Sequence, residues 1–397
     1  MKSAQSSKLH KHRNFRIIIS ITFIAVLGVS SITPVFPLLT KEFSITPQRV
    51  GLLITTYTLP GVLLTPLFGV FADRFGRKPI LVPSLFLFGI AGSACAFMEQ
   101  FKWILIFRLL QGTGGASLNS INVTVLGDLY EGNTRDTAMG YNSSILSIGT
   151  ALYPAIGGAL ALLGWRVPFL LPISAIPLGF ITLFLLQSPK PQNTQTMNAY
   201  LRNALDGLKN RDIVMIFVIC LATFIILYGS FISYFPFLLE HTFNANSLSI
   251  GFVMAGMSVA TALSSFQLGK LSKKRSKRQL LIIAFGIFFL TLILIPIIPF
   301  YIGVIITVTI FGGAVGLTIP SLQTILAEKT DMRHRAAFMS INGMVIRLGQ
   351  TIGPVLMGYM FKTTGIEGTF FMGAVIAGII VFIIYTFFNT QNSTSKI

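Results

Sequence analysis

The chain has 397 residues, of which 53% are hydrophobic and only 11% are charged. Because a soluble domain carries about 25% charged residues, this composition excludes an ordinary water-soluble globular protein and predicts one that faces lipid. The formal net charge of +18 would suit a nucleic-acid partner, but the basic residues lie in short loops between apolar runs, so we expect no such partner.

Apolar runs of about 20 residues, the length that crosses a bilayer, recur along the whole chain. They predict twelve membrane-spanning helices, at residues 15–38, 49–72, 79–98, 103–127, 137–162, 166–187, 212–238, 247–270, 279–298, 301–327, 338–361 and 368–388. These runs are too long for barrel strands, so we expect helices, in which the backbone N–H and C=O groups are hydrogen-bonded within lipid. The first run is too long for a signal peptide and lacks a cleavage site, so we interpret it as the first span.

Lysine and arginine are divided unevenly between the two sides of the predicted spans. With the N-terminus inside, the inner segments hold about 23 of the 30 basic residues and the outer loops about five. This asymmetry predicts that both termini lie in the cytoplasm. The short loops and the residue usage suggest the plasma membrane of a bacterium.

The longest polar segment, residues 188–211, predicts a cytoplasmic linker between an N-terminal bundle at 1–187 and a C-terminal bundle at 212–397. A shift of 200 residues matches Gly112 with Gly312, Asp128 with Glu328, and Pro154 with Pro354. Glycine, proline and charge seldom match by chance at one offset, so the chain contains an internal repeat. We therefore expect an all-α membrane fold of two pseudo-symmetric six-helix bundles.

The loop after the second predicted span reads Gly69-Val-Phe-Ala-Asp73-Arg74-Phe-Gly76-Arg77-Lys78-Pro79. It resembles the G-x-x-x-D-R-x-G-R-K-P loop of the major facilitator superfamily, a family of transporters. Glycine allows a tight turn, and the basic residues anchor at the cytoplasmic lipid surface. The resemblance implies a conformational latch, with Asp128 linked to Arg77 or Arg135. Its members are Gly69, Asp73, Arg74, Gly76, Arg77, Lys78 and Asp128. In the second half Lys273 replaces the acid, which argues against a second latch.

The fifth predicted span resembles the antiporter motif of the drug-exporting branch of this family, G-x8-G-x3-G-P-x2-G-G. The matching residues are Gly140, Gly149, Pro154, Gly157 and Gly158. Such glycines permit close helix packing, and proline bends the helix. Tyr153 stands where the family has glycine. The resemblance implies export in exchange for protons.

The fourth predicted span reads Arg108-Leu-Leu-Gln111-Gly112-Thr-Gly114-Gly115-Ala116, similar to the family pattern R-x-x-Q-G-x-G-x-A. An arginine within a span is costly and normally faces a polar interior or a partner. The resemblance places Arg108 in proton coupling or in the substrate cavity. Since Arg108 lies near the predicted outer boundary, snorkelling to the membrane surface is the alternative.

All twelve acidic residues fall in loops or near the ends of predicted spans. The chain therefore lacks the embedded carboxylate that many exporters of cationic drugs use. Arg347, near the middle of the eleventh span, is a functional-site hypothesis instead, with a structural role towards backbone carbonyls or Tyr and Asn side chains as the alternative. The candidates for coupling or for the substrate cavity are Arg108, Gln111, Asn119, Asn122, Asn142, Tyr228, Tyr234, Gln323, Asn342, Arg347 and Gln350.

These features predict proton-driven efflux of small amphipathic compounds or drugs by alternating access, with a preference for neutral, zwitterionic or anionic substrates. The chain is expected to act as a monomer in the lipid bilayer without a cofactor. Uptake or export of a specific metabolite or sugar by the same fold is the alternative. A membrane enzyme would need a catalytic constellation, and a sensor would need a large soluble domain; the sequence shows neither.

Overall fold

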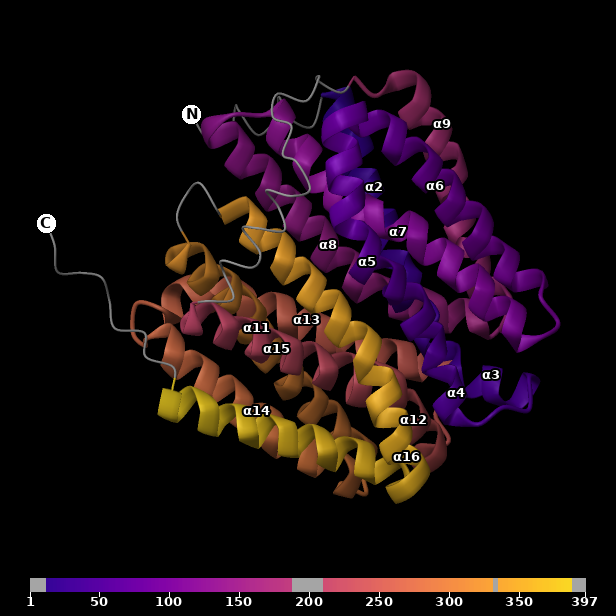
Figure 1. Ribbon diagram of the computed structural model, residues 1–397. Coiled ribbons are helices and arrows are strands. Elements are labelled where there is room, and N and C mark those ends of the chain that lie inside the picture. Colours follow the sequence, from indigo (N-terminus) through magenta and orange to yellow (C-terminus); the bar gives the residue numbers. More distant parts are fainter. Residues whose placement is uncertain (1–11, 188–209, 331–334, 388–397) are drawn as a thin grey trace, which may run out of the picture. The chain divides into compact units, whose positions relative to one another are not determined.

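The computed structural model describes residues 12–187, 210–330 and 335–387, except for the side chains of Asn119 and residues 335–337. All regular structure in these residues is helical (Figure 1). The chain forms two compact units. Unit 1 contains Met1–Tyr200 and Asn244–Ala255, and unit 2 contains Leu201–Phe243 and Gly256–Ile397.

Unit 1 is built from long apolar helices joined by short turns. Its elements are α2 (Arg13–Ser30), η1 (Thr33–Val35), α3 (Phe36–Glu42), α4 (Pro47–Val50), α5 (Leu52–Phe75), α6 (Arg77–Ala94), η2 (Cys95–Phe97), α7 (Phe101–Leu129), α8 (Gly132–Ala161), η3 (Val167–Ser174) and α9 (Ala175–Leu185). Helix α7 packs against α5, α6 and α2, and α8 packs against α2. Helix α7 thus lies where the polar candidates of this unit can meet side chains from several helices.

Unit 2 has the same kind of elements. They are α11 (Arg211–Ile225), the π-helix η4 (Ile226–Tyr234), α12 (Phe235–Phe243), α13 (Ser247–Leu271), α14 (Lys277–Ile297), α15 (Tyr301–Lys329) and α16 (Arg335–Phe387). The first residues of α13 belong to unit 1. Helix α16 consists of two helices, because Gly365 has φ 74° and ψ −171° and interrupts the helical backbone.

Ten of the described helical segments are long and apolar enough to cross a membrane. Residues 338–387 count once among these ten, although the break at Gly365 separates two predicted spans. Helix α7, with 29 residues, is not among them because polar residues such as Arg108 and Gln111 lower its mean hydropathy. Helices cover all twelve predicted runs within the described residues, which confirms the all-α membrane fold.

Large apolar side chains are exposed on many of these helices. Phe266 is 91% exposed, Leu163 77% and Phe184 75%. A soluble protein seldom exposes so much apolar surface, so this surface is suited to contact with lipid acyl chains. Each unit also buries apolar side chains, among them Phe88 in unit 1 and Phe285 in unit 2.

The two units repeat one helix contact at an offset of 200 residues. A Cβ atom added to Gly112 of α7 would lie 2.0 Å from the carbonyl oxygen of Tyr57 in α5. A Cβ atom added to Gly312 of α15 would lie 2.3 Å from the carbonyl oxygen of Met257 in α13. Both distances are far below van der Waals contact, so glycine is required where these pairs of helix backbones touch.

Candidate functional site

The first candidate site is an ion-pair cluster at the ends of α5, α6 and α7. Gly76 makes the turn between α5 and α6 with φ 98°, a conformation that favours glycine. Arg77 is buried and starts α6; its Nη1 lies 2.5 Å from Asp73 Oδ1, and its Nε donates to Asp128 Oδ2 at 3.1 Å. One guanidinium shared by two carboxylates ties the three helix ends together.

The other predicted latch residues lie beside this cluster. The Arg74 guanidinium is 5.4 Å from the ring centroid of Phe75, and Lys78 is half-buried. A Cβ atom on Gly69 would meet nothing within 4 Å. Within the described chain, close packing therefore does not explain glycine at position 69.

The second candidate site surrounds Arg108 in the interior of unit 1. Arg108 is only 1% exposed. Its Nε donates to the Leu53 carbonyl at 3.1 Å, its Nη1 donates to Gln111 Oε1 at 2.7 Å, and its guanidinium carbon lies 4.4 Å from the ring centroid of Tyr57. The side chain is therefore held inside the unit and does not snorkel to its surface. We call Leu53, Tyr57, Arg108 and Gln111 the Arg108 socket.

The Arg108 socket leaves one donor open. Arg108 Nη2 is buried and has no hydrogen-bond partner among the described residues, and no described carboxylate forms an ion pair with Arg108. A buried charge is normally paired or fully hydrogen-bonded. The sequence predicted Arg108 and Gln111 but not Tyr57 or Leu53. The motif lies on α7 alone, and it does not indicate which residues of α5 contact it.

A third polar cluster joins α2, α7 and α8 in unit 1. The Thr22 hydroxyl donates to Asn142 Oδ1 and accepts from Asn122 Nδ2. Asn122 Nδ2 also donates to the Ile18 carbonyl at 3.0 Å. The two predicted asparagines are thus brought together by a threonine that the sequence analysis missed. Its signal was a polar residue within the apolar first span.

The antiporter-like motif makes its closest contacts at its last two glycines. A Cβ atom on Gly157 would lie 1.8 Å from the Ser31 carbonyl oxygen, and one on Gly158 would lie 2.2 Å from the Ser247 carbonyl oxygen. Ser247 begins α13 and belongs to the same compact unit. Both glycines therefore allow direct contact between helix backbones.

The other motif positions have looser surroundings. A Cβ atom on Gly149 would be at least 3.4 Å from its neighbours, and one on Gly140 would meet nothing within 4 Å. The Pro154 carbonyl oxygen would lie 2.3 Å from a Cβ atom on Gly251. Tyr153, which departs from the family pattern, is buried with its ring centroid 4.8 Å from that of Phe23.

In unit 2 the predicted tyrosines lie on the π-helix η4. π-Helical turns are rare and occur frequently at functional sites. Tyr234 is fully buried; its hydroxyl donates to the Pro354 carbonyl at 3.2 Å, and its ring stacks on Phe361 at 5.4 Å between centroids. Tyr228 is half-buried with its ring 6.1 Å from that of Phe224. Tyr234 thus packs η4 against α16.

The remaining candidates of unit 2 do not form one described cluster. Arg347 is half-buried, and its Nη1 donates to Gln350 Oε1 at 3.4 Å. Asn342 is buried, and its Oδ1 has no partner among the described residues. Gln323 is exposed. Asn119, a predicted cavity residue on α7 of unit 1, has its side chain outside the described residues.

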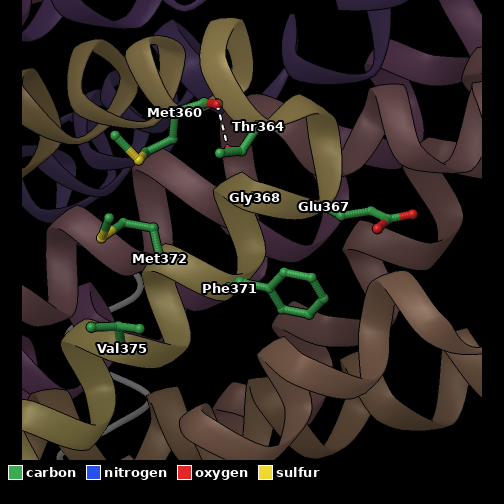
Figure 2. Close-up of a pocket in the computed structure, with 7 residues that line it drawn as sticks. All are labelled: Met360, Thr364, Glu367, Gly368, Phe371, Met372 and Val375. Atoms are coloured by element: carbon green, nitrogen blue, oxygen red, sulfur yellow. Dashed lines mark hydrogen bonds between the residues drawn. The ribbon is translucent and has the colours of Figure 1, made fainter.

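A cavity of about 290 Å³ lies along α16 and includes none of the predicted site residues. Its lining is Met360, Thr364, Glu367, Gly368, Phe371, Met372 and Val375 (Figure 2). The Thr364 hydroxyl donates to the Met360 carbonyl at 2.7 Å, as the dashed line in Figure 2 marks. The lining residues lie on both sides of the Gly365 break and are mostly apolar, with Glu367 as the charged residue among them.

The comparisons with known proteins identify the family. The model of the Major Facilitator Superfamily matches residues 18–301 and 217–396. The chain belongs to the major facilitator superfamily. This member is 26% identical to a bacillibactin exporter of Bacillus subtilis, with 86% of this chain and 88% of the relative covered. It is 24% identical to the quinolone resistance protein NorA of Staphylococcus aureus, and the alignment covers 91% of this chain and 94% of the relative.

Solved structures agree with the fold of this superfamily member. A bacterial homolog of the human lysosomal transporter Spinster, in an inward-facing and occupied conformation, matches with a TM-score of 0.80 at 16% identity and covers 94% of this chain and 95% of its own. The nucleoside transporter NupG, in a variant form, matches with a TM-score of 0.78 at 14% identity, covering 95% and 100%. The family match and the transporter relatives identify the protein as a multi-pass membrane transporter rather than an enzyme.

Proposed function

We propose that this transporter exports small amphipathic compounds or drugs in exchange for protons by alternating access. The observation that carries the proposal is Arg108, a permanently charged side chain buried in unit 1 with an open Nη2 donor. Burying an arginine in a membrane protein is costly and marks a functional group. The Arg108 socket therefore supports a role in the transport cycle rather than in surface anchoring.

The proposed direction rests on the named relatives. The bacillibactin exporter and the quinolone resistance protein NorA both align over most of this chain and of their own length. The protein named multidrug resistance protein 1 of Bacillus subtilis is also 25% identical over 88% of this chain and 90% of its own. The antiporter-like motif, with its close contacts at Gly157 and Gly158, adds support for outward transport.

The proposed substrate class follows from the charges inside the units. Among the described residues the buried charged side chains are Arg77 and Arg108, and no aspartate or glutamate is buried. A cationic drug would find no buried carboxylate as a counter-charge. We therefore propose neutral, zwitterionic or anionic compounds, recognised by polar residues that include Arg347 and Gln350.

We also propose the orientation and the assembly state. The basic residues Arg74, Arg77 and Lys78 at the α5–α6 turn suit the cytoplasmic side, and this supports the proposal that both termini lie in the cytoplasm. On this proposal the Asp73–Arg77–Asp128 cluster acts as a latch on the cytoplasmic side. One chain supplies both units, so a monomer is sufficient.

A resistance and accumulation screen tests this function. The full chain is expressed in a bacterial strain that lacks its own pumps, and the accumulation of fluorescent amphipathic compounds is measured with and without an uncoupler of the proton gradient. Proton-driven efflux lowers accumulation of at least one compound, and the uncoupler abolishes the difference. Accumulation that is lowered equally with the uncoupler present would contradict proton coupling.

Export of one specific metabolite is the second candidate function. The similarity to a bacillibactin exporter, whose name gives a single compound, favours it. The same screen separates the two candidates. A multidrug exporter lowers accumulation of several unrelated compounds, whereas a metabolite exporter acts on one chemical class alone.

A further inference from the structure

Tyr57 fits into a space that three glycines provide in unit 1. A Cβ atom on Gly28 of α2 would lie 2.1 Å from the Tyr57 hydroxyl oxygen, and one on Gly115 of α7 would lie 2.7 Å from it. A Cβ atom on Gly112 would lie 2.0 Å from the Tyr57 carbonyl oxygen. Any side chain at these positions of α2 and α7 would therefore displace the tyrosine.

The ring of Tyr57 faces the guanidinium of Arg108. The 4.4 Å distance from the guanidinium carbon to the ring centroid is within the range of a cation–π contact, and Tyr57 is only 3% exposed. A cation–π contact is worth more when its two groups are shielded from water than at an exposed site. With Leu53 and Gln111 accepting from Nε and Nη1, the ring completes a fixed orientation in which Nη2 stays open.

The repeat in unit 2 shows that helix packing does not require these polar groups. Gly312 keeps the close backbone contact that Gly112 makes in unit 1. At the repeat positions of Tyr57, Arg108 and Gln111, unit 2 has the buried apolar residues Met257, Val308 and Phe311. The same helix contact is therefore built without an arginine, its amide partner or an aromatic hydroxyl.

We propose that Tyr57 is a positioning residue for transport and that it acts through Arg108. A guanidinium stays charged at every physiological pH, so Arg108 acts as a fixed positive charge whose effect depends on where it is held. Tyr57 holds it through the ring face, and the glycines of α2 and α7 hold Tyr57. This inference rests on the proposed transport function, and it adds Tyr57 and Gly28 to the residues that the motif pattern indicates.

A double-mutant cycle on transport tests the inference. Tyr57→Met copies the residue at the repeat position in unit 2, and Tyr57→Phe keeps the ring face. Initial export rates are measured over substrate concentration and pH for each variant in the wild-type chain and in Arg108→Gln. Met257→Leu in unit 2 is the control for a conservative change at the equivalent helix contact, with membrane abundance measured throughout.

Tyr57→Met should lower kcat/KM by about tenfold or more, the size of a desolvated cation–π contact, while Tyr57→Phe retains most of the rate. In the Arg108→Gln chain, Tyr57→Met should change the remaining rate by less than about twofold, because coupled residues are not additive. An equal loss in both backgrounds, or an equal loss for Phe and Met, overturns the proposal.

A second readout separates this inference from the proposed function. The thermal unfolding midpoint of the purified full chain is measured for the same four combinations of Tyr57→Met and Arg108→Gln. Tyr57→Met should lower the midpoint clearly in the wild-type chain and by less in Arg108→Gln. Where the wild-type chain exports none of the compounds, the proposed function fails, but this cycle still tests whether Tyr57 acts through Arg108. Equal shifts in both backgrounds overturn the inference.

Discussion

Arg77 donates to Asp128, 51 residues further along the chain, and so ties the start of α6 to the end of α7. The same separation of 51 residues joins Lys277 to Glu328 at the start of α14 and the end of α15. The positions differ by the repeat offset of 200. The two pairs differ in their surroundings, since Arg77 is buried and also pairs with Asp73, whereas Lys273 replaces that acid in unit 2.

Because of this difference, we expect unequal effects on stability when the two cationic side chains are replaced. Arg77→Gln should destabilise the protein by about 1–3 kcal/mol, because charge-assisted hydrogen bonds to two carboxylates are lost. Lys277→Gln, in a pair whose acid side chain is 59% exposed, should cost about 1 kcal/mol or less. Thermal unfolding in detergent measures both. Equal shifts would contradict the stronger role assigned to Arg77.

The contacts of α8 predict a difference between two glycines of the antiporter-like motif. Gly157→Ala places a Cβ atom 1.8 Å from the Ser31 carbonyl oxygen, so overpacking should destabilise the protein by about 1–3 kcal/mol. Gly140→Ala meets no atom within 4 Å and should leave the folded yield unchanged. Fluorescence-detected size-exclusion chromatography compares the two variants. A lower yield for Gly140→Ala alone would refute this assignment.

The polar cluster at Thr22 predicts a modest effect on stability. Thr22→Val removes the hydroxyl that bridges Asn122 and Asn142, and hydrogen bonds between membrane helices average about 0.6 kcal/mol. A small fall in the unfolding midpoint is therefore expected. Thr324→Val is a matched control, since Thr324 is exposed and bonds within its own helix. A larger fall for the control would contradict the role of the bridge.

Replacing Arg347 is expected to abolish transport without a large loss of stability. Its side chain is half-buried and its described hydrogen bond, to Gln350, is long at 3.4 Å. Arg347→Ala should abolish export of a neutral, zwitterionic or anionic compound at unchanged membrane abundance, because a mid-span arginine marks a functional position. Arg275→Ala at an exposed position is the control. Unchanged resistance in Arg347→Ala would count against the hypothesis.

The Asp73–Arg77–Asp128 cluster illustrates how much of a site a local motif can predict. Asp73, Gly76 and Arg77 are close in the chain, and the turn at Gly76 with φ 98° follows from the residue type itself. The motif left two acceptable partners for Asp128, Arg77 and Arg135. The structure brings Asp128 to Arg77, and this choice depends on how α6 and α7 pack.

The Arg108 socket illustrates what a motif omits. The pattern of α7 marks Arg108 and Gln111, but Tyr57 and Leu53 lie on another helix at no fixed spacing from them. Apolar periodicity does not distinguish Tyr57 from any other aromatic residue of a lipid-facing span. Thr22 escaped prediction for the same reason, because only its neighbours on α7 and α8 give it a role.

The amino-acid sequence alone determined that this chain forms apolar helices, because each run by itself must be apolar enough for the bilayer and must satisfy its own backbone hydrogen bonds. The sequence also determined the duplicated arrangement, because the repeat keeps matching glycines, prolines and charges. Only the tertiary structure decided which polar side chains meet. Contacts such as Arg108 with Tyr57 depend on the rotation and register of neighbouring helices, and these are set by close packing at glycines rather than by any local pattern.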